Sequence, residues 1–269
     1  MNSVFFIRVF VASIGVGISL SLLSNLVVLR NFAFAGLGIT HSLLGGLGLG
    51  FLLGISPTVS TIVTALIVGF LISILTLKGR LTEQTAVGII FPVFMAGGII
   101  ALFFADKYSS DLLGYLFGNP LLITKSGLMI LAIFTVVVIL WLWAFFKELM
   151  FMAFDMELAK ASGIKVNLHH ILFMLILAVA VAIASKLVGI ILVSSLLVFP
   201  GATGLMIASD YRAMFLLSLL FGLCATVGGL YLAIVINLPP GATIVLLAGI
   251  IFLIILAAKR VLRMVKGAA

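Results

Sequence analysis

The sequence predicts an all-α, polytopic membrane protein with eight to nine transmembrane helices, folded as a single transmembrane domain over residues 1–269. Hydrophobic residues make up 65% of the chain and charged residues only 8%, whereas a soluble domain carries roughly 25% charged residues. The apolar runs continue over about 20 residues, the length that a helix needs to cross a bilayer, and lack the alternation of a β-barrel. The lipid bilayer is therefore the expected solvent.

Windows of about 20 residues place nine spans along the chain. The first, Phe5–Leu29, exceeds the apolar core of a signal peptide, so we expect an uncleaved span. The sixth, His170–Ser185, is only about 15 residues long, which predicts a tilted or partly unwound helix. Leu112–Ile123 is too short to cross and is expected to be an interfacial or re-entrant segment. The other spans are expected at Phe32–Leu53, Thr58–Leu77, Thr85–Ala105, Ser126–Phe146, Leu187–Ala208, Ala213–Ile236 and Ala242–Ala258.

The stretch Phe154–Asn167 is the one sizeable polar segment between long apolar runs. We expect it to form a short cytoplasmic helix that contacts a soluble partner. With this helix and the basic tail at 259–269 in the cytoplasm, eleven Lys and Arg residues, Arg30 among them, lie on that side. The net charge of +8 then reflects topology and does not indicate nucleic-acid binding. The four outer cations are Arg8, Lys107, Lys125 and Lys186, and we expect Lys186 to extend to the outer interface.

Small residues recur every four positions along the second span, at Gly38, Ser42, Gly46, Gly50 and Gly54. This spacing places them on one face of a helix, where they allow another backbone to approach closely in lipid. Tight helix packing is the favoured interpretation, and the lining of a transport pathway is the alternative.

His41 is the one titratable residue clearly within a span. Neutral imidazole binds zinc, manganese or iron, so the residues alone leave two roles open, a metal or pathway contact and a hydrogen-bonded structural histidine. His169 and His170, at the entrance of the sixth span, are expected to be solvated. Pro200 lies within the seventh span, where a proline kinks a helix and often borders a transport pathway.

The acidic residues all fall at span ends or in loops, which argues against a proton-coupled carrier. The sequence contains no Walker A, GxSxG or HExxH motif, so nothing in it predicts an enzyme.

Six motifs along nearly the whole chain resemble, in the same order, the membrane permease of ABC importers for zinc, manganese and iron(II). The motifs are RNFAFAGLGITHSLLGG at Arg30–Gly46, TEQTAVGIIF at Thr82–Phe91, YLFGN at Tyr115–Asn119, FDMELAKASGI at Phe154–Ile164, GIILVSSLLVFPGATG at Gly189–Gly204 and LPPGATIVL at Leu238–Leu246.

This resemblance implies a homodimeric permease in the cytoplasmic membrane, with two ATPase subunits inside and a metal-binding protein outside. The divalent metal is the transported substrate, no cofactor is tightly bound, and ATP hydrolysis on the separate chains drives alternating access. The pathway would include His41, Ser42 and Pro200. The stretch at about 154–167 resembles the helix that docks into the ATPase, with Asp155, Glu157, Ala161 and Gly163 at the matching positions.

The chain departs from the family pattern at Leu37, where relatives usually carry an Asp one turn before the His, and at Gln84, where many carry an Asp. His41 therefore lacks its usual carboxylate partner, which predicts weak and transient contact with a metal. The departure favours an alternative, an ABC permease of the same architecture for a non-metal or chelated substrate. A stand-alone secondary carrier or channel and a non-transporting membrane anchor are further alternatives.

Overall fold

The computed structural model describes residues 3–79, 81–105 and 123–267, and within these ranges every regular element is an α-helix. Helices suit these apolar runs because each helix satisfies its own backbone N–H and C=O groups, as lipid requires. The helices are α1 Ser3–Leu29, α2 Ala33–Leu53, α3 Pro57–Gly79, α4 Glu83–Phe104, α6 Lys125–Ala144, α7 Phe146–Phe154, α8 Met156–Ala161, α9 Val166–Val188, α10 Ile190–Leu196, α11 Phe199–Ile207, α12 Tyr211–Ile236 and α13 Pro240–Gly267.

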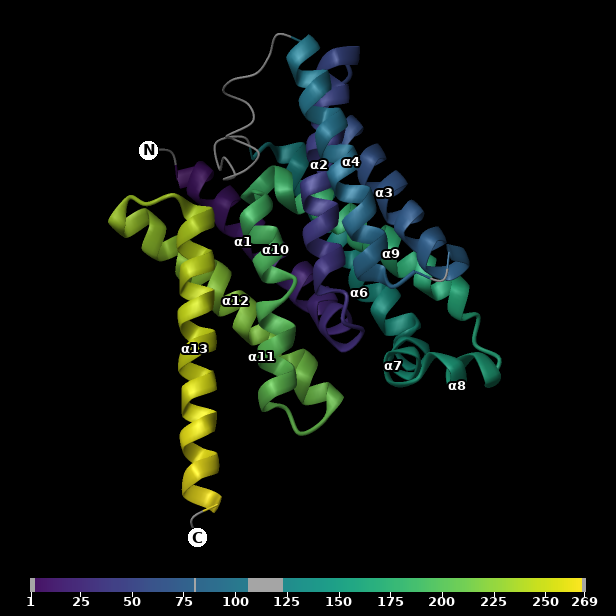
Figure 1. Cartoon of the computed structure of the whole chain (residues 1–269). Helices are drawn as coiled ribbons and strands as arrows, with labels where there is room; N and C mark the ends of the chain where they lie inside the picture. Colours follow the sequence, from purple (N-terminus) through teal and green to yellow (C-terminus); the bar gives the residue numbers. More distant parts are fainter. Residues whose placement is uncertain (1–2, 80, 106–122, 268–269) are drawn as a thin grey trace.

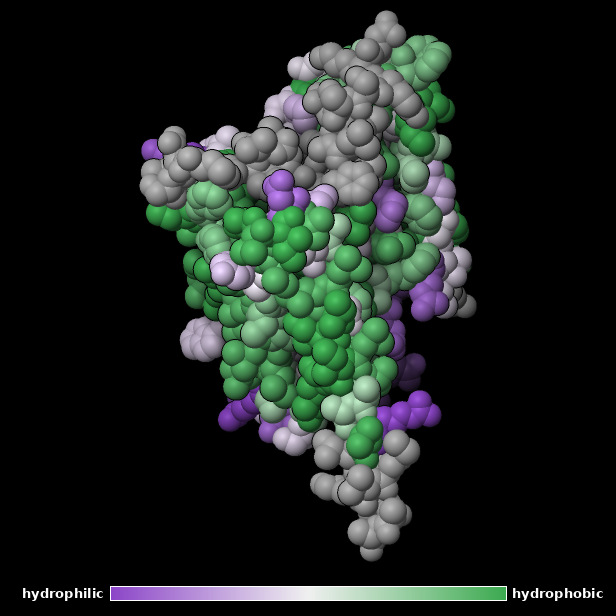
Figure 2. Space-filling model, turned by 90° about the vertical axis from the view of Figure 1, so that its left-hand side faces the viewer, coloured by the Kyte–Doolittle hydropathy of each residue, from purple (hydrophilic) through white to green (hydrophobic). Residues whose placement is uncertain are grey.

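Among the described residues, nine stretches are long and apolar enough to cross a membrane, which confirms the predicted fold class. Helices α10 and α11 together make one of these stretches, from Ile190 to Ile207. Figure 2 shows a broad hydrophobic band with hydrophilic residues toward its two ends, as a membrane-spanning bundle requires. The two ends of the chain point in opposite directions, and α8 lies toward the same end as the C-terminus (Figure 1). We call this end of the bundle the α8 end.

The spanning helices differ in how much of their surface the bundle covers. In α2 and α9, 67% and 61% of the span is buried, against only 17% in α13. Helix α2 packs against α3, α4 and α9, while α1 packs against α6, α11 and α12, and α13 packs on α10, α11 and α12 (Figure 1). The helix that carries His41 is therefore the innermost of the nine.

Glycine allows α2 to approach α4 closely. A Cβ on Gly48 would collide with the carbonyl oxygen of Gly98, and a Cβ on Gly98 would collide with the backbone of Leu44. On the side of α3, a Cβ on Gly46 would lie only 2.7 Å from Thr64 Oγ1. Packing of this kind replaces the hydrophobic driving force that is absent between helices in lipid.

Two further members of the predicted small-residue face also lie in close contacts, Gly38 against Val87 and Gly50 against Ser60. Gly54 differs, because it ends α2 with a φ of 68° and a Cβ there would meet nothing within 4 Å. Its role is therefore that of a C-terminal helix cap and not of a packing residue.

We expect Gly98→Ala to destabilise the bundle by about 1–3 kcal/mol, because the new methyl group would force α4 away from α2. The midpoint of thermal unfolding in detergent measures this effect. Gly97→Ala is the matched control, because Gly97 is next in sequence and a Cβ there meets nothing within 4 Å. Equal midpoints for the two variants would contradict the close α2–α4 contact.

Two predicted spans need correction. The sixth is not short, because α9 runs for 23 residues from Val166 to Val188 and so measures about 34 Å, enough to cross without unwinding. The seventh is not one kinked helix, because a turn at Leu197 and Val198 separates α10 from α11. Pro200 lies in the first turn of α11, where the backbone N–H groups have no partner within the helix, so the missing N–H of proline breaks no helical hydrogen bond. The N–H of the next residue, Gly201, donates to Ser24 Oγ at 2.8 Å.

The polar stretch Phe154–Asn167 is likewise not a single helix. It contains the last residue of α7, the six-residue α8, a turn in which Gly163 has a φ of 86°, and the start of α9. The basic tail continues α13 as a helix as far as Gly267. The predicted re-entrant segment Leu112–Ile123 lies outside the described residues apart from Ile123, and Arg80 and Lys107 also lie outside them.

Candidate translocation site

His41 is held by its own helix. Its Nδ1 lies 2.8 Å from the carbonyl oxygen of Leu37, one turn earlier in α2. A carbonyl oxygen only accepts hydrogen bonds, so Nδ1 carries the proton and donates it. The lone pair of the neutral ring is then on Nε2, the atom through which this imidazole could bind a cation. The structure thus orients His41 with one specific nitrogen available for metal contact.

Two hydroxyl groups lie beside this histidine. Thr40 Oγ1 donates to the same Leu37 carbonyl at 2.6 Å and lies 3.4 Å from His41 Nδ1. It also lies 3.2 Å from Ser194 Oγ in α10, within hydrogen-bonding distance. These contacts connect the His41 turn of α2 to α10, directly before the break that separates α10 from α11. Neither Thr40 nor Ser194 was predicted from the sequence as a site residue.

An open recess of about 430 Å³ lies on the same side of α2 as Leu37, at the α8 end of the bundle. Four helices or their flanking turns contribute to it, namely α1, α2, α4 and α11. Leu37, one turn before His41, and Gln84, in the first turn of α4, both face this recess, so the two positions at which the chain departs from the family pattern meet there. The lining residues are Val28, Asn31, Ala33, Phe34, Leu37, Gln84, Val198 and Ala202.

None of the three predicted pathway residues lines the recess, and His41 lies one turn beyond Leu37, which does. Ser42 is fully buried and donates to the carbonyl oxygen of Gly38 at 2.8 Å, as a helix-packing residue does. Pro200 is buried in the first turn of α11, between Val198 and Ala202, which do line it. The recess thus takes lining residues from the turn of α2 before His41 and from both sides of Pro200, whereas Ser42 has the contacts of a packing residue.

The side chains that line the recess are mostly apolar, with Asn31 and Gln84 as the polar ones. Within the described residues, no group of three or more His, Cys, Asp or Glu side chains is close enough together to hold a metal ion. A stable site for a transition metal takes about four ligands, whereas a pathway must release what it binds.

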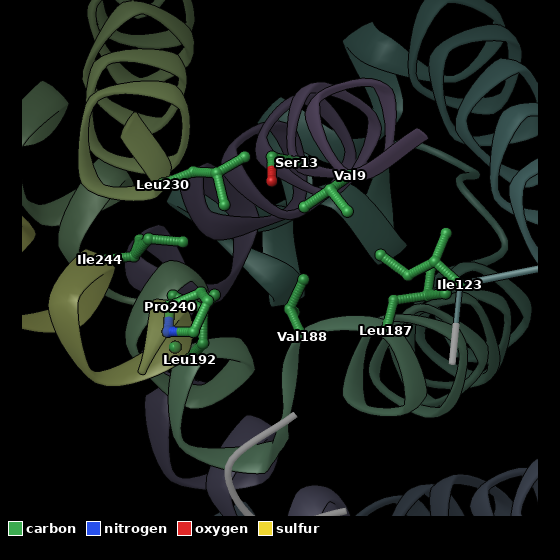
Figure 3. Close-up of a pocket in the computed structure, with 10 residues that line it drawn as sticks. Val9, Ser13, Ile123, Leu187, Val188, Leu192, Leu230, Pro240 and Ile244 are labelled. Atoms are coloured by element: carbon green, nitrogen blue, oxygen red, sulfur yellow. The ribbon is translucent and has the colours of Figure 1, made fainter. Parts of the chain in front are cut away.

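A second pocket, at the opposite end of the bundle, is a packing void (Figure 3). Its volume is about 20 Å³, room for roughly one water molecule, and Ser13 supplies the polar side chain among otherwise apolar labelled neighbours. Val9, Leu192 and Ile244 approach it from α1, α10 and α13 (Figure 3). A site with so few polar groups cannot replace the hydration shell of a cation.

The segment around α8 presents a mixed apolar and charged surface. The Asp155 carboxylate caps α8 by accepting from Leu158 N at 2.9 Å, and Gly163 ends the segment with its positive φ. The buried side packs through Met152, Ala159 and Val166. On the outer side, Phe154 is 76% exposed and Leu158 is 53% exposed, and Glu157, Ala161 and Gly163 are exposed as well. An exposed apolar cluster of this kind in a polar loop is typical of a docking surface.

A buried polar contact near α8 could not be predicted from the sequence. His169 and His170, predicted to be solvated, are 8% and 0% exposed. Arg30 is also buried, and its Nη2 lies 3.1 Å from His170 Nδ1. The prediction was wrong because polar residues at a span entrance usually face water, whereas here the α1–α2 turn covers the start of α9.

Nine candidate spans in the described residues, a histidine on the innermost helix, a recess at the α8 end and an exposed loop helix are the features expected of a membrane transport subunit. The chain matches the model of the ABC 3 transport family over residues 2–259, and it belongs to this family. Members of this family are the membrane permease components of ABC transporters, so the chain is a transport subunit and not an enzyme.

Several relatives align with nearly the full length of the chain. The manganese transport system membrane protein MntC of Listeria monocytogenes is 33% identical, over 94% of this chain and 90% of its own. The manganese import system permease protein ScaB of Streptococcus gordonii is 34% identical, over 91% of this chain and 87% of its own. Among solved structures, PsaBC from Streptococcus pneumoniae in complex with Fab superposes with a TM-score of 0.81 and 35% identity, over 93% of this chain and 90% of that one.

Proposed function

We propose that this chain is the permease subunit of an ABC importer that moves a divalent transition metal, with manganese as the first candidate, across the bacterial cell membrane. The observation that carries the proposal is His41 on the innermost helix, with Nδ1 bonded to the Leu37 carbonyl and Nε2 left as the ligand atom. The names of the MntC and ScaB relatives support manganese. Zinc and iron(II) are the other candidates, since imidazole binds all three ions.

Transport would proceed by alternating access. Two copies of the chain would place two His41 side chains along a shared pathway, and each copy would present its α8 surface to one cytoplasmic ATPase subunit. An extracellular metal-binding protein would deliver the ion. ATP binding would then move the two α8 segments and switch the pathway between its two openings.

Leu37 supports a second candidate function, the import of a metal chelate or another non-metal substrate. A carboxylate is the side chain that best suits manganese, and the chain has leucine where relatives usually carry Asp. A bare divalent ion beside Leu37 would have fewer charged ligands, whereas a chelate brings its own. The recess of about 430 Å³ has room for either substrate.

The experiment that tests the proposal is a competition panel. Cells that make the chain with its ATPase and binding protein are given labelled manganese, with unlabelled manganese, zinc, iron(II) and an iron chelate as competitors. We expect one of the free ions to compete in micromolar excess. Competition by the chelate alone would replace the metal proposal with the second candidate.

We expect Leu37→Asp to strengthen manganese binding to the purified chain by roughly tenfold. A carboxylate about 4 Å from a cation gains several kcal/mol at an effective dielectric near 20, and the cost of desolvating the carboxylate offsets all but about 1–2 kcal/mol of this gain. Equilibrium dialysis with metal analysis measures the affinity. Leu37→Asn has the same shape without the charge and is the matched control. Equal affinities for the two variants would show that this position does not face the cation.

A further inference from the structure

Arg30 is a charged residue at a buried junction. It follows the last residue of α1 and is only 9% exposed. Its guanidinium carbon lies 4.4 Å from the centre of the Phe32 ring and 5.5 Å from that of Phe173 in α9. Both distances are within the range of a cation–π interaction. The charge is thus held between the residue that precedes α2 and the body of α9.

The contact with His170 has a defined direction. A guanidinium has donors and no acceptor, so the 3.1 Å contact requires His170 Nδ1 to accept, which makes the ring neutral with its proton on Nε2. The His170 ring also meets Phe32 edge-on, with 5.7 Å between the ring centres. Arg30, Phe32 and His170 therefore form one three-way contact between the α1–α2 turn and α9, and we call it the Arg30 junction.

The junction also reaches α8. The same Nη2 lies 3.9 Å from the sulfur of Met156, the first residue of α8. The residue after Arg30, Asn31, has a φ of 57°, and α2 begins at Ala33. The guanidinium of Arg30 thus contacts α8 and α9. Only Asn31 and Phe32 separate Arg30 from the start of α2, the helix that carries Leu37 and His41.

Burying the charged side chain of Arg30 costs free energy that an apolar residue at this position would avoid. Burial lowers the pKa of its guanidinium to about 10, and the opposing effect of the Glu83 carboxylate is smaller, so the group stays charged at neutral pH. Its Nη1 has no hydrogen-bond partner. Replacing a buried ion by an apolar residue of similar volume is often neutral or stabilising. In contrast to an apolar residue, Arg30 stacks on aromatic rings and donates hydrogen bonds. These directional contacts resist movement of the α1–α2 turn relative to α8 and α9.

We propose that Arg30 is a positioning residue that transmits movement of α8 to the first turn of α2, and so links ATP hydrolysis to the opening of the recess. The proposal rests on the proposed function, in which an ATPase moves α8. When α8 moves, Met156 and the start of α9 carry the guanidinium with them, and Phe32 moves the first turn of α2. Ala33 and Phe34 on that turn, and Leu37 directly after it, line the recess, so its shape changes.

The test measures ATP hydrolysis and metal accumulation in the same proteoliposomes, which contain the chain with its ATPase and loaded binding protein. We expect Arg30→Met to lower the amount of metal moved per ATP by about tenfold while hydrolysis continues. Arg212→Met is the matched control, because Arg212 is an exposed arginine at the same end of the bundle, and it should leave the ratio unchanged. A parallel fall of transport and hydrolysis, with the ratio preserved, would overturn the proposal.

A second pair of variants covers the case in which Arg30→Met fails to fold. His170→Gln retains a side-chain acceptor for the guanidinium and should keep the ratio within about twofold of wild type, whereas His170→Leu removes the acceptor and should lower it as Arg30→Met does. Equal ratios for these two variants would also overturn the proposal.

A distance measurement separates this proposal from the proposed function. Spin labels at Ala161 in α8 and Phe34 in the first turn of α2, both exposed, report whether the two move together when nucleotide binds. Cys224 is replaced first so that the labels are specific. We expect nucleotide to leave the distance between the two labels nearly unchanged in the wild type, because α8 and the first turn of α2 move together, and to change this distance in Arg30→Met. If the wild type moves no metal, the proposed function fails, and these distances still decide the role of Arg30.

Discussion

The His41→Ala variant is expected to accumulate metal roughly 10- to 100-fold more slowly than the wild type, because the pathway loses its imidazole ligand. His41 is on the innermost helix and its Nδ1 is already bonded to the Leu37 carbonyl, so the part of the ring that remains for the ion is Nε2. Uptake of labelled metal into proteoliposomes measures the loss. ATP hydrolysis by the partner chain should continue.

Two amide variants separate a metal contact from a structural role for His41. His41→Asn places an N–H near the position of Nδ1 and can still donate to Leu37, but it has no atom at the position of Nε2. His41→Gln reaches the position of Nε2 with a polar group. We expect the asparagine variant to be as slow as the alanine variant. Full uptake by His41→Asn would show that His41 is a hydrogen-bonded structural histidine, the second of the two roles that the sequence leaves open.

The Leu158→Glu variant is expected to weaken binding of the ATPase subunit by at least about 30-fold, the effect of losing one central contact of about 2 kcal/mol. Leu158 is 53% exposed on α8, so the bundle itself does not need it, and the unfolding midpoint should match that of the wild type. A charge buried at its centre would disrupt an apolar docking surface. Titration of the labelled ATPase against the chain in nanodiscs measures the affinity.

Leu158→Met is the control for this prediction, because it preserves the apolar surface and the helix. Its affinity should lie within a few-fold of the wild type. Unchanged ATPase affinity in Leu158→Glu would mean that α8 is an ordinary connecting loop. Phe154, which is 76% exposed, provides an independent second position for the same pair of substitutions.

The spans could be predicted from sequence because hydrophobicity over about 20 residues is a local property. The predicted spans were wrong where contacts between distant residues decide the structure. At the start of α9, Asn167 and His169 were placed outside the predicted span and His170 at its first residue, and both histidines were expected to be solvated. Packing buries both histidines, and the helix includes all three residues. Just after the break between α10 and α11, Gly201 N donates to Ser24 of α1, a contact between distant residues that no window around Pro200 can reveal.

The candidate site was predictable only in part. His41 could be proposed as a site residue because a titratable residue within a span is rare. The Arg30–His170 contact could not, because the two residues are 140 positions apart and each has an ordinary local explanation, a loop cation and an interfacial histidine. Thr40 and Ser194, 154 positions apart, meet beside His41 for reasons that only the packing of α10 on α2 shows. The hydroxyl groups of single threonines and serines within spans carry no comparable signal in the sequence.

Manganese accumulation inside proteoliposomes that contain the chain and its ATPase tests most directly whether this protein is an ATP-driven metal permease. The binding protein loaded with manganese is supplied outside, ATP is enclosed with the ATPase domains, and the internal metal is counted over time. We predict accumulation against a gradient that stops when ATP is replaced by a non-hydrolysable analogue. Accumulation at the same rate without ATP or without the ATPase would identify a secondary carrier or channel and contradict the assignment as an ATP-driven permease.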